Sequence, residues 1–388
     1  MGILRDTHRL MAVATTLAAL LAAAAPASAG PVAAAGDSRE LPMYKIPNLP
    51  ENGEAYYAPD GVHLIAQVKD PDAQDPGPGR VGGALTYTFT DKGEDIRRIN
   101  DRGQDACSWF YPDGKRLLWT STRDHLDDMP AGNWSDDADY PQGAELYSSD
   151  LDGRNVRRLT NNRWYDAEAT VSPDGKWIVF GRQIDGNADL WRMKSDGTEQ
   201  TQLTFTSDWQ EGEAYFMPDS ETVIFRAWKN SEKQRIEEED RKNGTRTQTP
   251  MNIYSMKIVG PDRDVQPRTF TSDTNWAPFP APDGRHFLVV RILERGNWEL
   301  FLADMAGGEP VRLTYNAGWD GMGAFSPDGK KMVFTRGEPG SHALYSYVMD
   351  VSSLNVGPEN YQGVPPKAEP PAGWQPDPDF AAWRVQPK

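Results

Sequence analysis

The sequence predicts an all-β protein, a six-bladed β-propeller of four-stranded antiparallel blades that is closed by an N-terminal strand. Three observations predict it: a repeated turn, four strand-like segments in each repeat, and a last repeat that lacks its fourth segment. The turn reads Pro-Asp-Gly or a close variant before an apolar run, and its prolines are Pro59, Pro112, Pro173, Pro218, Pro282 and Pro327. Their steps of 53, 61, 45, 64 and 45 residues give a period near 45 with insertions, which is typical of repeat architectures such as propellers.

The third repeat illustrates how one blade is built. Its segments AEATVS, WIVFGR, LWRMKS and QTQLTF each have the composition of a strand. Between the first two, Pro173-Asp174-Gly175 predicts a tight turn, because proline presets its own φ, aspartate bonds the turn backbone and glycine accepts a positive φ. Asp196-Gly197 predicts a second turn before the fourth segment. Four short antiparallel strands of this kind make one blade.

The last repeat predicts how the ring closes. It contains LYSYVMDVSS from Leu344 but no fourth strand. The segment MYKIPN at Met43 precedes the first blade and resembles the missing strand. We therefore expect it to pair in the last blade, which removes an open sheet edge. The propeller is predicted to span residues 41–354.

A proline-rich tail, residues 355–388, follows the propeller. Proline this dense cannot build another blade, and the tail also holds Trp374, Phe380 and Trp383. We expect an extended strap that its aromatic residues anchor along the propeller. A disordered peptide that recruits a partner is the alternative.

Residues 1–29 predict a signal peptide. Arg5 and Arg9 give a basic start, an apolar run follows from Leu10, and small residues end at Ala29. We expect cleavage near Ala29 and a periplasmic or secreted mature protein. No later apolar stretch reaches the ~20 residues of a transmembrane helix, so we expect a soluble chain without a membrane span.

The charge of the chain narrows the classes of partner. The formal net charge is 41 minus 57, or −16, and removal of the signal peptide leaves 39 minus 56, or −17. Such a chain is repelled by nucleic acid and by anionic lipid. Cys107 is the only cysteine, so an internal disulfide is excluded and a buried, inert thiol is expected.

Long insertions mark the face where we expect function. They begin at Asp70, Arg123 and Trp228, each after the second strand of its blade, and therefore gather on one face of the propeller. Function is often carried by loops on a rigid scaffold. Within the third insertion, the segment from Ser231 has charged residues at helical spacing and predicts a short solvated helix.

The innermost strands begin on this same face, and their first residues are the main candidate site. Seven residues before each repeat proline stand Asn52, Asp105, Asp166, Glu211, Asn275 and Asp320. Two residues further on stand Glu54, Cys107, Glu168, Glu213, Ala277 and Met322. Innermost strands line the central channel, so the first set predicts a polar ring near its mouth.

Aromatic residues adjoin this ring. Trp164, Tyr165, Trp209, Trp276 and Trp319 each lie within three residues of it. An acidic channel mouth with aromatic walls suits a cation, a sugar or a basic peptide segment. The alternative is structural, because Asn and Asp are common where a loop enters a strand and their side chains bond the nearby backbone.

Signals for chemistry are few. The second insertion offers Asp136, Asp137 and Asp139 as candidate calcium ligands, but their spacing matches no EF-hand loop. We expect no other cofactor. The chain has no G-x-S-x-G motif, and the histidines that follow the signal peptide are scattered, so we predict no catalytic residue.

The repeat itself resembles a known family. The phrase SPDGKWIVFGR, the Asp-Gly turn and the Leu-Thr ending are similar to the repeats of TolB-like six-bladed propellers over roughly residues 41–353. This chain has only about two dozen residues between the predicted cleavage site and the first blade, so we expect it to lack the N-terminal α/β domain of TolB. The same blade type occurs in peptidases of the prolyl oligopeptidase family and in oligogalacturonate lyases, so the fold alone does not choose a function.

These observations favour an exported binding or scaffold protein of the cell envelope. Its expected partner is an envelope protein or a small ligand at the channel mouth, while its oligomeric state stays open. The alternative is an enzyme, a lyase or hydrolase, that processes polysaccharide or peptide at the same place.

Overall fold

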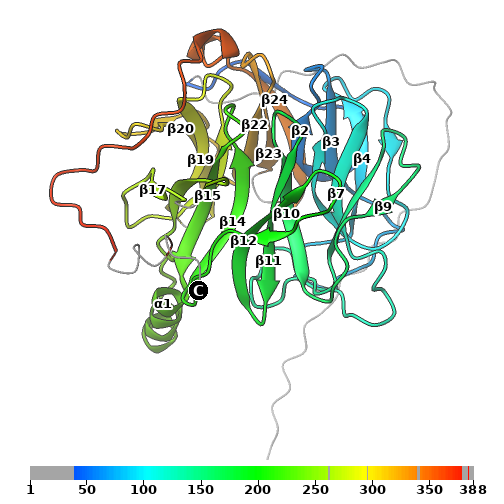
Figure 1. Ribbon diagram of the computed structural model, residues 1–388, viewed down its shortest axis with the longest axis horizontal. Helices are drawn as coiled ribbons and strands as arrows, with labels where there is room; N and C mark the ends of the chain where they lie inside the picture. Colours follow the sequence, from blue (N-terminus) through cyan, green and yellow to red (C-terminus); the bar gives the residue numbers. More distant parts are fainter. Residues whose placement is uncertain (1–38, 261–262, 295, 339–340, 378–382, 384–388) are drawn as a thin grey trace, which may run out of the picture.

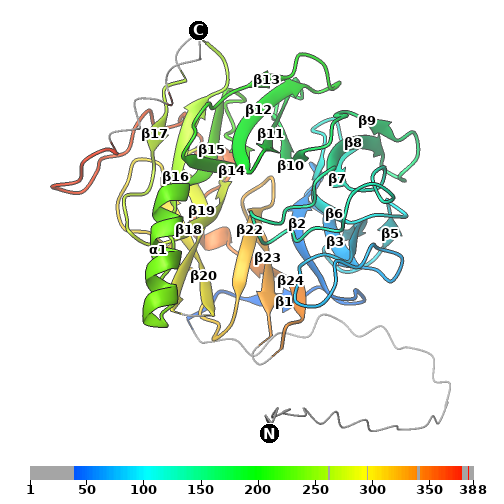
Figure 2. The same cartoon turned by 90° about the horizontal axis from the view of Figure 1, so that it is seen from below.

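A computed structural model describes residues 39–260, 263–294, 296–338, 341–377 and Trp383. In this part of the chain, six four-stranded antiparallel sheets stand as blades around a central axis (Figures 1 and 2). The predicted fold class is therefore confirmed. No helix among these residues has the length and apolar character needed to cross a membrane. The signal peptide predicted for residues 1–29 lies outside the described residues.

The first five blades each use four consecutive strands, and the sixth uses three strands and β1. The strands of the first three blades are β2 (Asn52–Tyr57), β3 (His63–Lys69), β4 (Ala84–Thr90), β5 (Arg97–Arg98), β6 (Asp105–Phe110), β7 (Arg116–Ser121), β8 (Glu145–Asp150), β9 (Arg157–Arg158), β10 (Tyr165–Val171), β11 (Trp177–Ile184), β12 (Asn187–Lys194) and β13 (Thr201–Gln202). Those of the last three are β14 (Trp209–Phe216), β15 (Thr222–Lys229), β16 (Asn252–Lys257), β17 (Gln266–Pro267), β18 (Asn275–Pro280), β19 (His286–Glu294), β20 (Asn297–Asp304), β21 (Val311–Arg312), β22 (Asp320–Phe325), β23 (Lys331–Gly337) and β24 (Leu344–Asp350).

The ring closes as predicted. β1 (Met43–Lys45) pairs antiparallel with β24, and Tyr44 stands opposite Val348. Residues far apart in sequence thus share the last blade, in the order β1-β24-β23-β22. This pairing covers the edge that β24 would otherwise expose.

The second strand of each blade carries a run of buried apolar residues. Phe180, Phe225 and Phe334 come from three different blades, and none of them has exposed area. These strands read as continuous apolar runs because both of their faces are covered. Each fully buried side chain of this size contributes roughly 1.5–3 kcal/mol of transfer free energy.

All three long insertions lie on one face, as predicted. They connect β3 to β4, β7 to β8 and β15 to β16. The third contains the predicted helix, α1 (Asn230–Asn243), beside the ring in Figure 2. Asp208 from a neighbouring loop accepts a hydrogen bond from the Ser231 N–H at 2.8 Å and so satisfies one of the first N–H groups of the helix.

The described part of the tail follows the outside of the propeller (Figure 1). Arg268 donates hydrogen bonds to the carbonyls of Pro365 and Pro366 at 2.9 and 3.2 Å. Further along, Trp374 contacts Phe270 edge to face, with ring centroids 5.0 Å apart. The strap interpretation is compatible with these contacts.

Candidate functional site

Every innermost strand carries the same irregularity. In each blade the register between the first and second strands shifts by one residue, which is a β-bulge. One residue at each bulge has a left-handed backbone, with φ between 44° and 55°: Glu54, Cys107, Glu168, Glu213, Ala277 and Met322. All six line the central cavity. Non-glycine residues in this conformation cost about 1–3 kcal/mol each, and such strain gathers at functional sites.

The bulges surround a chamber of about 900 Å³ on the propeller axis. Its floor is formed by aromatic side chains two residues beyond the bulges, Tyr56, Trp109 and Tyr215, and Phe279 packs against these rings. The hydroxyl oxygens of Tyr56 and Tyr215 are 2.7 Å apart. Because these residues come from the first and fourth blades, on opposite sides of the ring, their contact closes the channel below the bulges.

Three glutamates and one arginine form the charged wall of the chamber. Arg226 places Nη2 2.9 Å from Oε1 of Glu168 and Nε 3.4 Å from Oε1 of Glu213. The Glu213 N–H also donates to Oε2 of Glu168 at 2.7 Å. Glu54 accepts a hydrogen bond from the Cys107 N–H at 3.3 Å and another from the Tyr56 hydroxyl at 3.4 Å. The cluster therefore carries more negative than positive charge when it is fully ionised.

Burial changes the proton affinity of these groups. It raises the pKa of Glu54 to about 7, although the hydrogen bond from Cys107 acts in the opposite direction. It also raises the pKa of Glu213 to about 7, against the attraction of Arg226. The pKa of the Cys107 thiol is raised by burial and by the nearby Glu54 carboxylate, which keeps it protonated and inert. Two carboxyls of the chamber thus titrate close to neutral pH.

Ion pairs and a hydrogen bond join the three insertions to one another over the mouth of the chamber. Arg80 in the first pairs with Asp139 in the second at 2.8 Å, and Val81 donates its N–H to Asn133 Oδ1 at 2.9 Å. Lys233 of α1 forms an ion pair with Asp137 of the second insertion. On the other side of the mouth, Trp276, Trp298 and Trp319 lie with ring centroids 5.6–6.4 Å apart. Loops of three blades and a tryptophan cluster therefore frame the entrance.

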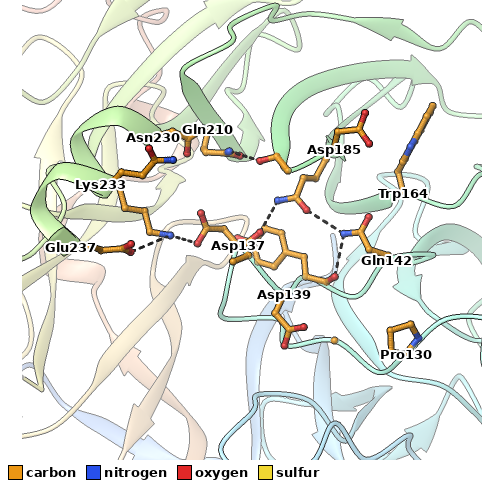
Figure 3. A pocket seen from close by; sticks show the side chains of 16 residues that line it. Pro130, Asp137, Asp139, Gln142, Trp164, Asp185, Gln210, Asn230, Lys233 and Glu237 are labelled. Carbon is orange, nitrogen blue, oxygen red and sulfur yellow. Dashed lines mark hydrogen bonds and ion pairs between the residues drawn. The ribbon is translucent and has the colours of Figure 1, made fainter. Parts of the chain in front are cut away.

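A second hollow of about 620 Å³ adjoins the mouth. Figure 3 shows it between the second insertion, the turn at Asp185 and α1, with Trp164 at its edge. Amide side chains brace its wall: Gln142 donates to Gln183 Oε1 at 3.1 Å, and Gln183 donates to the Asp137 carbonyl at 2.8 Å. Asp137 and Lys233 line both hollows, so their ion pair lies on the boundary between them.

The six predicted strand-entry residues do not form an open polar ring at the channel mouth. Each is at most 4% exposed, and the four that do not line the chamber are Asp166, Glu211, Asn275 and Asp320. Asp166 holds Arg182 of its own blade through two contacts of 2.6 and 2.7 Å, and Asp320 holds Arg336 in the same way. Glu211 accepts from the Thr204 and Thr206 hydroxyls. These contacts lie within the fold, but they join side chains, whereas the structural alternative expected bonds to the nearby backbone. Ligand binding by the six stays a prediction.

The other predicted site residues are dispersed. Glu168, Glu213, Trp276 and Trp319 all line the chamber, and ligand binding by them stays a prediction. Trp164 is 39% exposed at the second hollow. Trp209 is buried against Trp383 of the tail, with ring centroids 4.8 Å apart, and lies away from the mouth.

The candidate calcium ligands have other partners. Asp137 pairs with Lys233, Asp139 pairs with Arg80, and Asp136 accepts the N–H of Ala138 at 3.1 Å. Among the described residues, no group of three or more His, Cys, Asp or Glu side chains could hold a metal ion. Calcium binding here stays a prediction.

Comparisons with known proteins agree on the fold. No protein-family model matches the chain. A TolB homologue from Chlorobium chlorochromatii is 26% identical over 190 residues, which are 49% of this chain and 28% of that protein. The structure of TolB from Acinetobacter baumannii matches with a TM-score of 0.54 and 19% identity, over 74% of this chain and 63% of that one. A putative TolB from Agrobacterium tumefaciens matches with a TM-score of 0.52 and 18% identity, over 79% of this chain and 96% of that one.

The chain is a TolB-like six-bladed β-propeller. It spans less than half the length of the curated relatives it matches. The likeness to solved TolB structures, at below 20% identity, concerns the fold.

Sequence analysis did not identify several residues of the chamber, although Arg226 has a sequence signal. The repeat arginines Arg182, Arg291 and Arg336 stand nine residues after their repeat prolines, and each contacts the strand-entry residue of its blade. Arg226 stands eight residues after Pro218. Because side chains alternate between the faces of a strand, this shift sends Arg226 to the chamber carboxylates.

Proposed function

We propose that this TolB-like propeller is an exported binding protein of the periplasm or the cell exterior. It takes a small ligand, or a segment of an envelope protein, into the chamber from the long-loop face. One observation carries the proposal: the same strained bulge in all six blades points a side chain into one cavity of about 900 Å³. An aromatic wall with a few fixed polar groups is typical of binding sites.

Thermal unfolding of residues 30–388 tests this proposal. The panel contains calcium, other divalent ions, oligosaccharides and basic peptides. A ligand that binds only the folded state raises the melting temperature by mass action. We expect a rise that is lost in Met322→Trp, which places a bulkier side chain in the chamber, and kept in Val311→Trp, where the side chain is exposed outside it. A rise that survives in Met322→Trp would move the site elsewhere.

Export is part of the proposal and has its own test. The basic start, apolar run and small residues that end at Ala29 support it. Mass spectrometry of protein from the periplasm or the medium is expected to find Gly30 at the N-terminus. Protein that keeps residues 1–29 and stays in the cytoplasm would contradict export.

A second candidate function is an enzyme that acts on polysaccharide or peptide in the same chamber. It is favoured by the pKa values of about 7 of Glu54 and Glu213, because groups poised near neutrality suit general acid and base roles. Incubation of each panel ligand with the protein, followed by product analysis, separates the two functions. Turnover that is lost in Glu54→Gln would favour the enzyme, and an unchanged ligand that stays bound would favour binding.

A further inference from the structure

We propose that the chamber selects ligands that carry a protonated amine, bound between Glu54 and Glu213. The inference rests on the proposed function, because it names the ligand class of the same chamber. Three separate properties of the wall lead to it: its charge, its unpartnered acceptor atoms and its aromatic surface.

The charge of the wall favours a cation. Glu54, Glu168 and Glu213 face one cationic partner, Arg226, which contacts only the last two. Cations nearer the mouth are already paired: Lys233 with Asp137 and Lys69 with Glu51, while Arg80 pairs with Asp139. A ligand with positive charge therefore completes the cluster, whereas an anion would meet uncompensated carboxylates.

The unpartnered atoms of the wall offer two acceptors to a hydrogen-bond donor, and they also include two donors, Trp134 Nε1 and Arg226 Nε. Oε2 of Glu213 and Oε1 of Gln67 are buried and have no hydrogen-bond partner among the described residues. Both residues line the chamber, and Gln67 is only 8% exposed. The amide nitrogen of Gln67 donates a hydrogen bond to the Ser108 hydroxyl at 3.0 Å. Buried acceptors without partners cost about 1–3 kcal/mol each. An ammonium group carries three donors and no acceptor, so it matches them.

The aromatic surface favours an alkyl amine over a bare metal ion. Tyr140 and Tyr165 stack with ring centroids 4.4 Å apart, and Trp276, Trp298 and Trp319 form the opposite side of the mouth. Such faces pack against methylene groups and attract a cation through the ring quadrupole. No group of described residues is arranged to hold a metal.

Two sources share this chemistry: a free alkyl diamine and a lysine side chain of a peptide. Calorimetric titration distinguishes them with two matched pairs. The first pair is 1,4-diaminobutane and 1,4-butanediol, and the second is the blocked peptide acetyl-Ala-Lys-Ala-amide and its norleucine analogue, which carry no terminal amine. We expect one amine of these pairs to bind and both neutral analogues to fail.

Variants place the amine in the chamber. We expect Glu213→Gln and Glu54→Gln each to weaken binding about tenfold, equivalent to about 1.4 kcal/mol. The matched control is Asp189→Asn, which also neutralises a buried carboxyl whose pKa is raised to about 6 but which does not line the chamber. Binding should also strengthen from pH 6 to pH 8 as both glutamates ionise. Other ionisable groups at the wall include Glu168, His342 and Asp105, and burial raises the pKa of Asp105 to about 6.

Each outcome decides something. Amine binding that is weakened in both glutamate variants and kept in the control supports the inference. An amine affinity that is unchanged in Glu54→Gln and in Glu213→Gln overturns the inference, and equal binding of the neutral analogues overturns it as well. If a neutral ligand raises the melting temperature and loses this effect in Met322→Trp while both amines are inert, the amine assignment fails and the binding role holds. If neither the amines nor any ligand of the thermal panel binds, both fail.

Discussion

Arg182 and Arg226 occupy the second strands of neighbouring blades, yet they serve opposite faces of the sheet. Arg182 holds Asp166 inside its own blade at 2.6 and 2.7 Å. Arg226, one residue closer to its repeat proline, holds Glu168 and Glu213 in the chamber. Moving the arginine by one position along the strand thus takes it from a pair inside the blade to the wall of the site, because strand side chains alternate with a period of two.

The Asp166–Arg182 pair should matter for stability. Both side chains are almost completely buried. Removing one partner of a buried pair leaves an uncompensated charge, which costs about 3–5 kcal/mol. We expect Asp166→Ala to lower the free energy of unfolding by this amount in urea denaturation. The control is the double variant Asp166→Leu/Arg182→Met, which should recover most of the loss; an unchanged midpoint for Asp166→Ala would contradict the prediction.

Glu54 should make stability depend on pH. Its pKa is about 7 in the folded protein and 4.5 as the ordinary value, so the folded state holds the proton more tightly. Stability therefore falls as the pH rises from 4.5 to 7 and stays lower above it. We expect Glu54→Gln to be more stable than the wild type by on the order of 2 kcal/mol at pH 8 and equal to it below pH 4.5. Urea denaturation at both pH values measures this, and an equal difference at both would rule out the titration.

At the scale of elements, the strands and the closure were predictable and the bulges were not. Pro-Asp-Gly turns and apolar runs have local signatures, so residues such as Pro173 place their strands directly. A left-handed backbone at Glu168 has no such signature, because glycine, the usual residue in that conformation, is absent there. Only the assembled blades show that six such residues meet around one cavity.

β1 should be essential although it has only three residues. It is the strand that covers β24, so its loss opens the ring and exposes a sheet edge. We expect deletion of residues 41–48 to abolish soluble expression. Tyr44→Pro should reproduce much of the defect by removing a ladder N–H, while Tyr44→Thr should not. A deletion variant with an unchanged circular dichroism spectrum and melting curve would disprove closure by β1.

At the scale of the whole molecule, the net charge and the roof that the three long insertions form over the chamber (between β3 and β4, β7 and β8, and β15 and β16) influence how partners approach. The net charge of −16 is consistent with a ligand that is cationic. The arrangement of the roof depends on pairs such as Lys233–Asp137 and Arg80–Asp139, which join insertions of different blades. Sequence could place these insertions on one face but could not match their charges, because the loops have no repeat to align.

The same charge should make the fold sensitive to salt. Like charges across the surface repel, and salt shortens the screening length from roughly 30 Å at 0.01 M to about 8 Å at 0.15 M. We expect the melting temperature to rise by a few degrees over this range in sodium chloride. A non-ionic solute at equal osmolality is the control and should leave it unchanged. A fall with salt would mean that attractive ion pairs outweigh the repulsion.

The contact between Tyr56 and Tyr215 makes the central channel a dead-end pocket that opens only on the face of the long insertions. A bound ligand therefore enters and leaves through the same opening and does not reach the opposite face of the propeller. Such a protein can keep and return a molecule but cannot pass it from one side to the other. A partner protein that accepts the ligand would have to dock on the loops around this opening, where Trp276 and the Lys233–Asp137 pair lie. Transfer of the ligand to that partner would then compete with its release into solvent.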